Sequence, residues 1–158
     1  MEELKEIKQE YEKLKQKYKL PEFNQLTEDF DIEKVSEKTT SFLLREIRKI
    51  ISEKLSNYLH LFEAFLNPAT PSIFMFTILK NSTEEEKIII KEIYKRLTKL
   101  QLITLKLDTI YREKNEAEFI IKANLEWSEL KQKSYNLFEQ FETKFEEENN
   151  TKKRGYFG

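Results

Sequence analysis

Residues 32–66, IEKVSEKTTSFLLREIRKIISEKLSNYLHLFEAFL, decide the fold class of this chain. The stretch contains no proline and no glycine, and its apolar side chains recur with the spacing of a broad helical stripe. These side chains are Val35, Phe42, Leu43, Ile47, Ile50, Ile51, Leu55, Tyr58, Leu59, Phe62, Phe65 and Leu66. The pattern predicts one long helix, or two helices with a slight bend. We expect Asp31 to cap its N-terminus, and Asn67 with Pro68 to end it.

The chain before this stretch carries another helical pattern, with apolar residues at alternating spacings of three and four. Such a seam is typical of coiled coils and helical hairpins. The seam consists of Leu4, Ile7, Tyr11, Leu14 and Tyr18. It packs either on its own bundle or against a second copy of the chain, as a homodimer through the N-terminal helix. Pro21 predicts the end of this helix.

A connector, LPEFNQLTEDFDIEK, then occupies residues 20–34. Its three large apolar side chains, Phe23, Leu26 and Phe30, are expected to lie on the core.

Two more helices are predicted in the second half of the chain. Ser82 or Thr83, followed by three glutamates, has the composition of a helix N-terminus, where acidic residues are favoured. The apolar residues of this helix are Ile89, Ile93, Leu97, Leu100, Ile103, Leu107 and Ile110, and it ends near residues 112–115. The last helix extends from about residue 116 to 148. Its apolar face holds Ile120, Trp127, Leu130, Tyr135, Leu137, Phe138, Phe141 and Phe145.

The segment SIFMFTILK, residues 72–80, is nearly free of charge in an otherwise highly charged chain. It is far too short to cross a bilayer, which takes about 20 apolar residues. We therefore expect a short helix that is buried at one end of the bundle. The alternative is an exposed patch that binds a partner.

Composition supports an all-α fold. The chain has 158 residues, 36% of them charged and 13% aromatic, and contains only two glycines and three prolines. So few glycines and prolines cannot supply the many tight turns of a β-sandwich or a β-barrel. The sequence predicts an all-α helical bundle of four long helices plus one short buried helix. We expect residues 1–148 to form a single domain and residues 149–158 a flexible basic and aromatic C-terminal tail.

The termini and the apolar runs give no sign of a membrane protein. The first residues, MEELKEIKQE, are charged, and no apolar run approaches the length of a membrane span. Cysteine is absent, which excludes disulfides, thiolate metal sites and a cysteine nucleophile. We expect a cytoplasmic protein without a membrane partner.

Motifs for catalysis or metal binding are missing from the sequence. His60 is the only histidine, and one histidine with Glu63 supplies too few ligands for a zinc or di-iron site. No glycine-rich phosphate loop and no nucleophile elbow occur. We expect His60 to be a partly buried packing residue. The sequence thus predicts a protein that is not an enzyme and has no cofactor and no metal site.

Charge is unevenly distributed between the last two predicted helices. Lys87, Lys91, Lys95 and Lys99 recur every four residues and form one ridge, referred to below as the lysine ridge. The last helix is acidic, with nine glutamates against four lysines between residues 116 and 148. The two helices are expected to pack antiparallel with complementary edges. Alternatively, the lysine ridge within residues 87–106 binds nucleic acid.

The chain ends in NNTKKRGYFG, a composition unlike anything before it. It is either a frayed terminus or a short docking peptide. In the second case the partner-binding residues are Lys152, Lys153, Arg154, Tyr156, Phe157 and the terminal Gly158.

Three stretches carry a family resemblance. They are LPEFNQLTEDFDIEK, FLLREIRKIISEKLSNYLHLFEAFLNP and LKLDTIYREKNEAEFI. Together they resemble a family of small all-helical archaeal proteins of uncharacterised function, over roughly residues 1–140. The resemblance implies an intracellular archaeal origin. It transfers no active residue, and the chain beyond residue 145 lies outside it.

These observations favour a non-catalytic interaction or adaptor module that binds a protein partner. The alternative is a nucleic-acid-binding module that uses the lysine ridge and the C-terminal tail.

Overall fold

The computed structural model describes residues 1–37, 41–67 and 72–157. Within these ranges it contains helices and no strand. The elements are α1 (Glu2–Tyr18), α2 (Phe23–Phe30), the 3-10 helix η1 (Ile32–Glu37), α3 (Leu43–Leu66), α4 (Ile73–Leu79), α5 (Glu84–Thr109) and α6 (Glu113–Phe157). The prediction of an all-α helical bundle with four long helices is confirmed, since α1, α3, α5 and α6 are the long ones.

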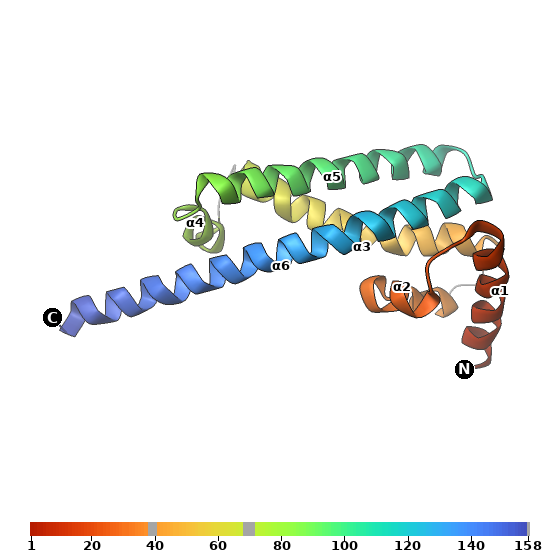
Figure 1. Ribbon diagram of the computed structural model, residues 1–158, viewed down its shortest axis with the longest axis horizontal. Helices are drawn as coiled ribbons and strands as arrows, with labels where there is room; N and C mark the ends of the chain where they lie inside the picture. Colours follow the sequence, from red (N-terminus) through yellow and green to blue (C-terminus); the bar gives the residue numbers. More distant parts are fainter. Residues whose placement is uncertain (38–40, 68–71, 158) are drawn as a thin grey trace.

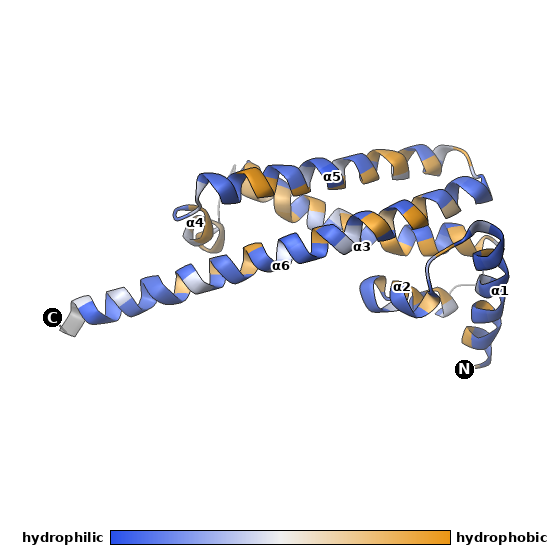
Figure 2. Ribbon diagram, viewed as in Figure 1, coloured by the Kyte–Doolittle hydropathy of each residue, from blue (hydrophilic) through white to orange (hydrophobic). Residues whose placement is uncertain are grey.

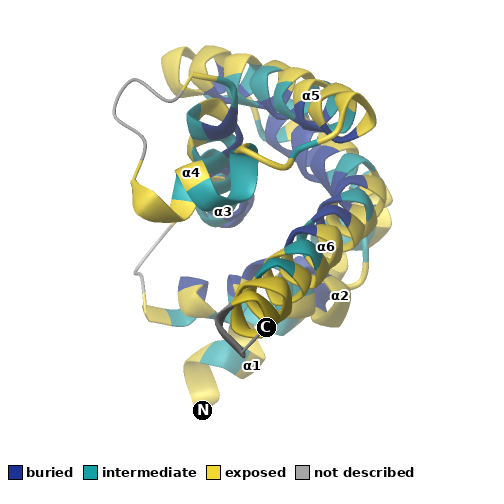
Figure 3. Ribbon diagram, turned by 90° about the vertical axis from the view of Figure 1, so that its left-hand side faces the viewer, coloured by how far each residue is buried: buried dark blue, intermediate teal, exposed yellow. Residues whose placement is uncertain are grey.

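The core forms where α3, α5 and α6 lie side by side (Figure 1). Apolar residues gather on the inward faces of these helices (Figure 2), and the view along the bundle shows the buried residues turned toward one another (Figure 3). Each fully buried aliphatic or aromatic side chain stabilises the fold by about 1.5–3 kcal/mol relative to an exposed one. The most buried members include Leu44, Ile47, Ile51, Phe62, Ile90, Ile93, Leu97, Ile120 and Leu130.

The N-terminal segment closes one end of this core. Tyr11 of α1 is fully buried, and its hydroxyl donates a hydrogen bond to the carbonyl oxygen of Pro21 over 2.8 Å. The other four seam residues are partly buried against the core. The seam therefore packs on its own bundle. Whether a homodimer also forms through the N-terminal helix stays a prediction.

The expected connector contains a helix that the sequence interpretation missed. Phe23, Leu26 and Phe30 are buried as predicted, and they lie on α2. Asp31 does not cap the helix that follows it. It is the left-handed C-cap of α2, with φ 57°, and its N–H donates to the carbonyl oxygen of Thr27 over 2.8 Å.

The stretch of residues 32–66, expected to form one long helix or two helices with a slight bend, forms two elements, the 3-10 helix η1 and the α-helix α3. Val35 of η1 is fully buried, as the apolar stripe predicted, and so is Ile32, but the α-helix of this stretch begins only at Leu43. Residues 38–40, between Glu37 and α3, lie outside the described part of the chain.

The last helix continues past its predicted end at residue 148. α6 extends to Phe157 and projects beyond the rest of the bundle (Figure 1). No proline interrupts this segment, and the single interior glycine, Gly155, costs only about 1 kcal/mol relative to alanine. Glu148 and Lys152 add an ion pair at 3.2 Å along the helix. The division into a domain of residues 1–148 and a tail of residues 149–158 stays a prediction, and Gly158 lies outside the described residues.

Candidate functional site

The short helix α4 is exposed, which corrects the expectation that it is buried. Its N-terminus is capped by Ser72, whose hydroxyl accepts a hydrogen bond from the N–H of Met75 over 3.2 Å. Ile73 is 88% exposed and Phe74 66% exposed, and no residue of α4 is fully buried. The helix attaches to the bundle by one face, whose partly buried residues are Met75, Ile78 and Leu79. At this end of the bundle α4 packs against α6, so its other faces stay uncovered.

The projecting part of α6 presents phenylalanines opposite α4. Phe138 stacks with Phe62 of α3 at a centroid distance of 6.1 Å, and Phe141 meets the edge of Phe65 at 5.9 Å. Phe145 follows one turn later and is 50% exposed. The aromatic face of α6 thus starts inside the core and continues out of it.

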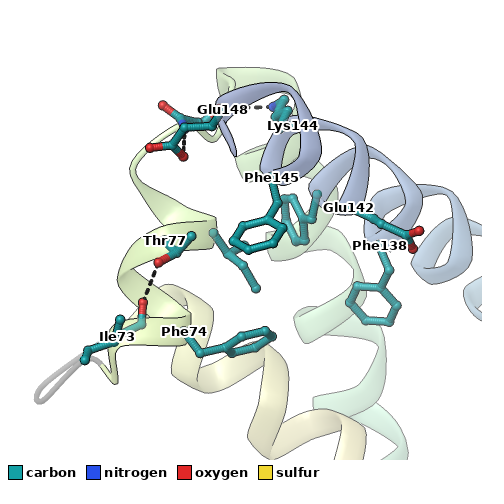
Figure 4. Close-up of a pocket in the computed structure, with 11 residues that line it drawn as sticks. Ile73, Phe74, Thr77, Phe138, Glu142, Lys144, Phe145 and Glu148 are labelled. Atoms are coloured by element: carbon teal, nitrogen blue, oxygen red, sulfur yellow. Dashed lines mark hydrogen bonds between the residues drawn. The ribbon is translucent and has the colours of Figure 1, made fainter. Parts of the chain in front are cut away.

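Between α4 and α6 lies an apolar groove with a volume of about 600 Å³. Its walls are Ile73, Phe74, Thr77 and Ile78 on one side and Phe138, Phe141 and Phe145 on the other. The rings of Phe74 and Phe145 point into the space between the two helices (Figure 4). This α4–α6 groove is the candidate functional site.

Charged groups fix the rim of the α4–α6 groove. Lys80, just after α4, forms an ion pair with Glu148 of α6. The hydrogen bonds from Lys80 and then from Lys152 hold the pKa of the Glu148 carboxyl below its usual value. Lys144 donates to the carbonyl oxygen of Asn81 over 3.0 Å and also binds Glu86. These contacts join α6 to the turn between α4 and α5.

The outer side of the same α6 segment is acidic. A second hollow is lined by four carboxylates, those of Glu86, Glu139, Glu142 and Glu147, against the single cation Lys144. Glu86 is buried, and its Oε2 atom has no hydrogen-bond partner. The α4–α6 groove is therefore apolar inside and flanked by negative charge.

The predicted tail residues lie on the last turns of α6, beyond the groove. Lys152, Lys153 and Arg154 are exposed. At Gly155 an added Cβ would have no atom of the chain within 4 Å. Tyr156 and Phe157 end the helix, and Gly158 is outside the described residues. Lys152, Lys153 and Arg154 are not among the residues that line the α4–α6 groove of their own chain.

The lysine ridge faces away from the core, with all four lysines exposed. Lys87 forms an ion pair with Glu84 of its own helix at 3.2 Å. α5 and α6 pack against each other with opposite charges paired between them, as expected, although the ion pairs among the described residues do not involve the ridge lysines. α5 and α6 are bridged by other charges instead, with Arg96 bound to Glu126 at 2.7 Å and to Glu129 at 2.8 Å. Of the ridge lysines, Lys99 borders the same hollow as Arg96 and Glu126.

His60 is exposed and not a partly buried packing residue, which corrects the expectation from sequence. Its Nδ1 atom lies 3.6 Å from Glu63 Oε2, and its Nε2 atom 3.4 Å from the hydroxyl of Ser56. Among the described residues, no group of three or more histidine, cysteine, aspartate or glutamate side chains is arranged to hold a metal ion.

Sequence interpretation missed a buried ion cluster near the turn between α5 and α6. Arg48 of α3 binds Glu116 of α6 at 2.7 Å and Asp108 of α5 at 2.8 Å. The sequence does contain a sign of this cluster, because Arg48 lies one turn after Leu44 and one turn before Ile51, within the apolar stripe of α3. A charged residue at such a position indicates a buried partner.

Comparison with known proteins assigns the chain to no family. The chain matches no protein-family model, no curated protein and no solved structure. The resemblance to small archaeal helical proteins stays an expectation. In the described part of the chain, none of the helices combines the length and the apolar character needed to span a membrane.

Proposed function

We propose that this protein is a non-catalytic interaction module that binds a helix of a protein partner in the α4–α6 groove. The observation that carries the proposal is the exposure of Phe74 and Phe145, on two different helices, toward one shared apolar space. Clustered exposed apolar side chains with a polar rim are typical of protein-binding surfaces. A groove between helices accepts an amphipathic helix through apolar side chains on one of its faces.

The charges beside the groove define the partner further. Between residues 139 and 148, α6 carries five glutamates and one lysine. A bound helix would therefore present apolar side chains to the groove and basic side chains to its flank. Complementary charges of this kind increase association rates and select the orientation of the partner.

The test is capture of partner proteins from native lysate by the full chain, with quantification by mass spectrometry. Phe74→Ser removes a groove side chain that the fold does not need, since it is mostly exposed. Leu125→Ser is the matched control, because Leu125 is exposed to a similar degree, 64%, on a part of α6 away from the groove. Loss of captured proteins with F74S but not with L125S supports the groove as the binding site. Equal capture by both variants contradicts it.

A nucleic-acid-binding function is the second candidate, and one observation favours it. Lys91, Lys95 and Lys99 form a line of exposed cations on α5, and the described part of the chain offers them no ion pair within 4 Å. Binding to phosphates would release counterions and weaken steeply with salt. We would compare RNA and DNA binding at low salt for the wild type, K91E/K95E and the control K5E/K13E, which changes the net charge equally on α1. Binding lost only in K91E/K95E supports this function, and no binding by the wild type at low salt excludes it.

A further inference from the structure

The outer side of α5 carries large aliphatic side chains that are exposed. α5 packs against α3 and α6 through its buried residues, among them Ile90 and Leu97. On the opposite side of the helix Ile88 is 64% exposed, Leu102 61% and Leu105 55%. Figure 3 shows this outer side of α5 as the exposed edge of the bundle. The packing of the bundle therefore does not account for these three side chains.

The three residues belong to a seam with the spacing of a coiled coil. Positions separated alternately by three and four residues follow the outer side of α5 from residue 88 to residue 109. This outer seam consists of Ile88, Lys91, Lys95, Thr98, Leu102, Leu105 and Thr109. All of them are exposed except Thr98, which is half-buried. A second helix can lie along a seam of this kind over its whole length.

Five lysines lie on or beside the outer seam. They are Lys87, Lys91, Lys95, Lys99 and Lys106, and all of them are exposed. Among the described residues, only the first of the five has an ion pair, with Glu84. The carboxylates of α5 between residues 87 and 109 do not neutralise the others, because Glu92 binds Lys133 of α6 and Asp108 binds Arg48 of α3. The outer seam therefore combines aliphatic side chains with unopposed positive charge.

We propose that the outer seam of α5 binds an acidic amphipathic helix of a partner protein. The bound helix sets apolar side chains against Ile88, Leu102 and Leu105 and carboxylates against the lysines. Opposed charges of this kind set partner choice and orientation in paired helices. Since α5 contributes no residue to the α4–α6 groove, this is a second and independent binding surface. The two surfaces have opposite charge, as suits an adaptor between two partners.

Charge rules out a second copy of α5 as the occupant. In a pair of α5 helices joined along their outer seams, the lysines of one copy face the lysines of the other. Like charges placed opposite each other across an interface are strongly unfavourable. The occupant is therefore a helix with carboxylates where α5 has lysines.

The arrangement of the residues favours a helix over a membrane surface or a nucleic acid. A helix that lies in a bilayer surface buries an apolar face and keeps its lysines on the other face. On α5, Lys91 and Lys95 lie on the same line as Ile88 and Leu102. The phosphates of a nucleic acid would bind the lysines but would leave the aliphatic side chains uncovered. An acidic amphipathic helix provides contacts for both kinds of side chain.

The test is the binding of a labelled synthetic helix to the full chain, measured by fluorescence anisotropy. The probe is about three heptads long, to match the outer seam, with leucine at its seam positions and glutamate at the flanking positions. A peptide of the same composition in scrambled order, which has no seam, is the control. We expect the acidic probe to bind, more weakly as salt screens the charges, and the scrambled peptide to bind far less.

Substitution of the central lysines tests the charge of the outer seam. K91E/K95E should raise the dissociation constant of the acidic probe at least about tenfold, because carboxylates then face carboxylates. K5E/K13E changes the net charge equally on α1 and should bind the probe as the wild type does. Circular dichroism confirms that both variants remain folded.

Substitution of the exposed leucines tests the apolar part of the outer seam. L102Q/L105Q leaves the charge and the helix propensity nearly unchanged and should also raise the dissociation constant at least about tenfold. L125Q removes a similarly exposed leucine from α6 and should have no effect. F74S should have no effect either, because Phe74 lies in the α4–α6 groove.

Binding that is lost in both K91E/K95E and L102Q/L105Q supports the inference. No binding of the acidic probe by the wild type overturns it. Binding that is lost in K91E/K95E but kept in L102Q/L105Q also overturns it, because the surface then attracts negative charge alone, as a nucleic-acid-binding surface does. Self-association of the wild type that disappears in K91E/K95E, measured by sedimentation, would show that the occupant is a second copy of the chain and would overturn it as well.

Discussion

Arg48 and Glu116 form an ion pair inside the core, with 2.7 Å between Arg48 Nε and Glu116 Oε2 and side chains that are 1% and 0% exposed. The same guanidinium reaches Asp108 at 2.8 Å. One side chain of α3 therefore holds α5 and α6 where the chain turns between them. The α4–α6 groove lies at the opposite end of the bundle from this cluster (Figure 1). We interpret the ion pairs of Arg48 as contacts that fix the alignment of the three core helices.

Removing one member of this pair should destabilise the protein strongly. Glu116→Leu leaves the Arg48 guanidinium buried with only Asp108 as a partner, and we expect a loss of about 3–5 kcal/mol in the free energy of unfolding. The double variant R48M/E116L leaves no buried charge, so it should be more stable than E116L. Chemical denaturation of wild type and variants measures both. A double variant that is less stable than E116L would contradict this explanation.

The exposure of α4 predicts a contrast between two phenylalanines. Phe76 is 61% exposed and Phe62 is fully buried. Phe76→Ala should change the free energy of unfolding by no more than about 0.5 kcal/mol, as is usual for surface positions. Phe62→Ala should cost about 3–5 kcal/mol, because it leaves a cavity in the core. A large cost for F76A, measured by denaturation, would mean that α4 is buried after all.

Glu113 makes stability depend on pH in the acid range. Its Oε1 atom accepts a hydrogen bond from the Tyr18 hydroxyl at 2.7 Å and one from Lys17 at 3.1 Å. The hydrogen bond from Tyr18, and then that from Lys17, hold the pKa of the Glu113 carboxyl below its usual value. A lowered pKa means that the folded state favours the ionised form. The resulting stabilisation is complete above the unfolded pKa of about 4.3 and disappears as the pH falls through the folded pKa.

We therefore expect Glu113→Gln to lower the melting temperature at pH 6 and to have a smaller effect at pH 3. Glu118→Gln is the control, because the Glu118 side chain is 62% exposed and its ion pair with Lys114 is long, at 3.9 Å. An equal effect of E113Q at both pH values would show that the charge of Glu113 is not responsible.

The sequence predicted the helical class and most of the core, because apolar periodicity reports which side chains are buried. Phe23, Leu26 and Val35 were correctly predicted to be core residues, although the helices that carry them were not predicted with their true bounds. Helix ends depend on single backbone conformations, such as the left-handed Asp31, which the spacing of side chains does not encode.

The α4–α6 groove could not be predicted from apolar periodicity, for a different reason. A run such as residues 72–80 has the same composition whether it is covered or exposed, so its burial depends on which helices reach it. The groove arises only because α6 passes α4 and continues outward. The Arg48 cluster was equally hidden, since the sequence does not show that Asp108 and Glu116 lie beside position 48.

The last turns of α6 should contribute little to the stability of the bundle. Removing residues 151–158 takes away Lys152, Lys153 and Arg154, which are exposed, while Phe138 and Phe141 keep their contacts with α3. We expect the melting temperature to stay within about 2 °C of the wild type, since surface changes of this kind amount to about 0.5 kcal/mol or less. Substitution of Asn149 and Asn150 by alanine, which keeps the helix and the charges, is the matched control and should also leave the melting temperature unchanged. If the truncation instead lowers the melting temperature by several degrees, the last turns of α6 stabilise their own bundle and are not a separate binding element.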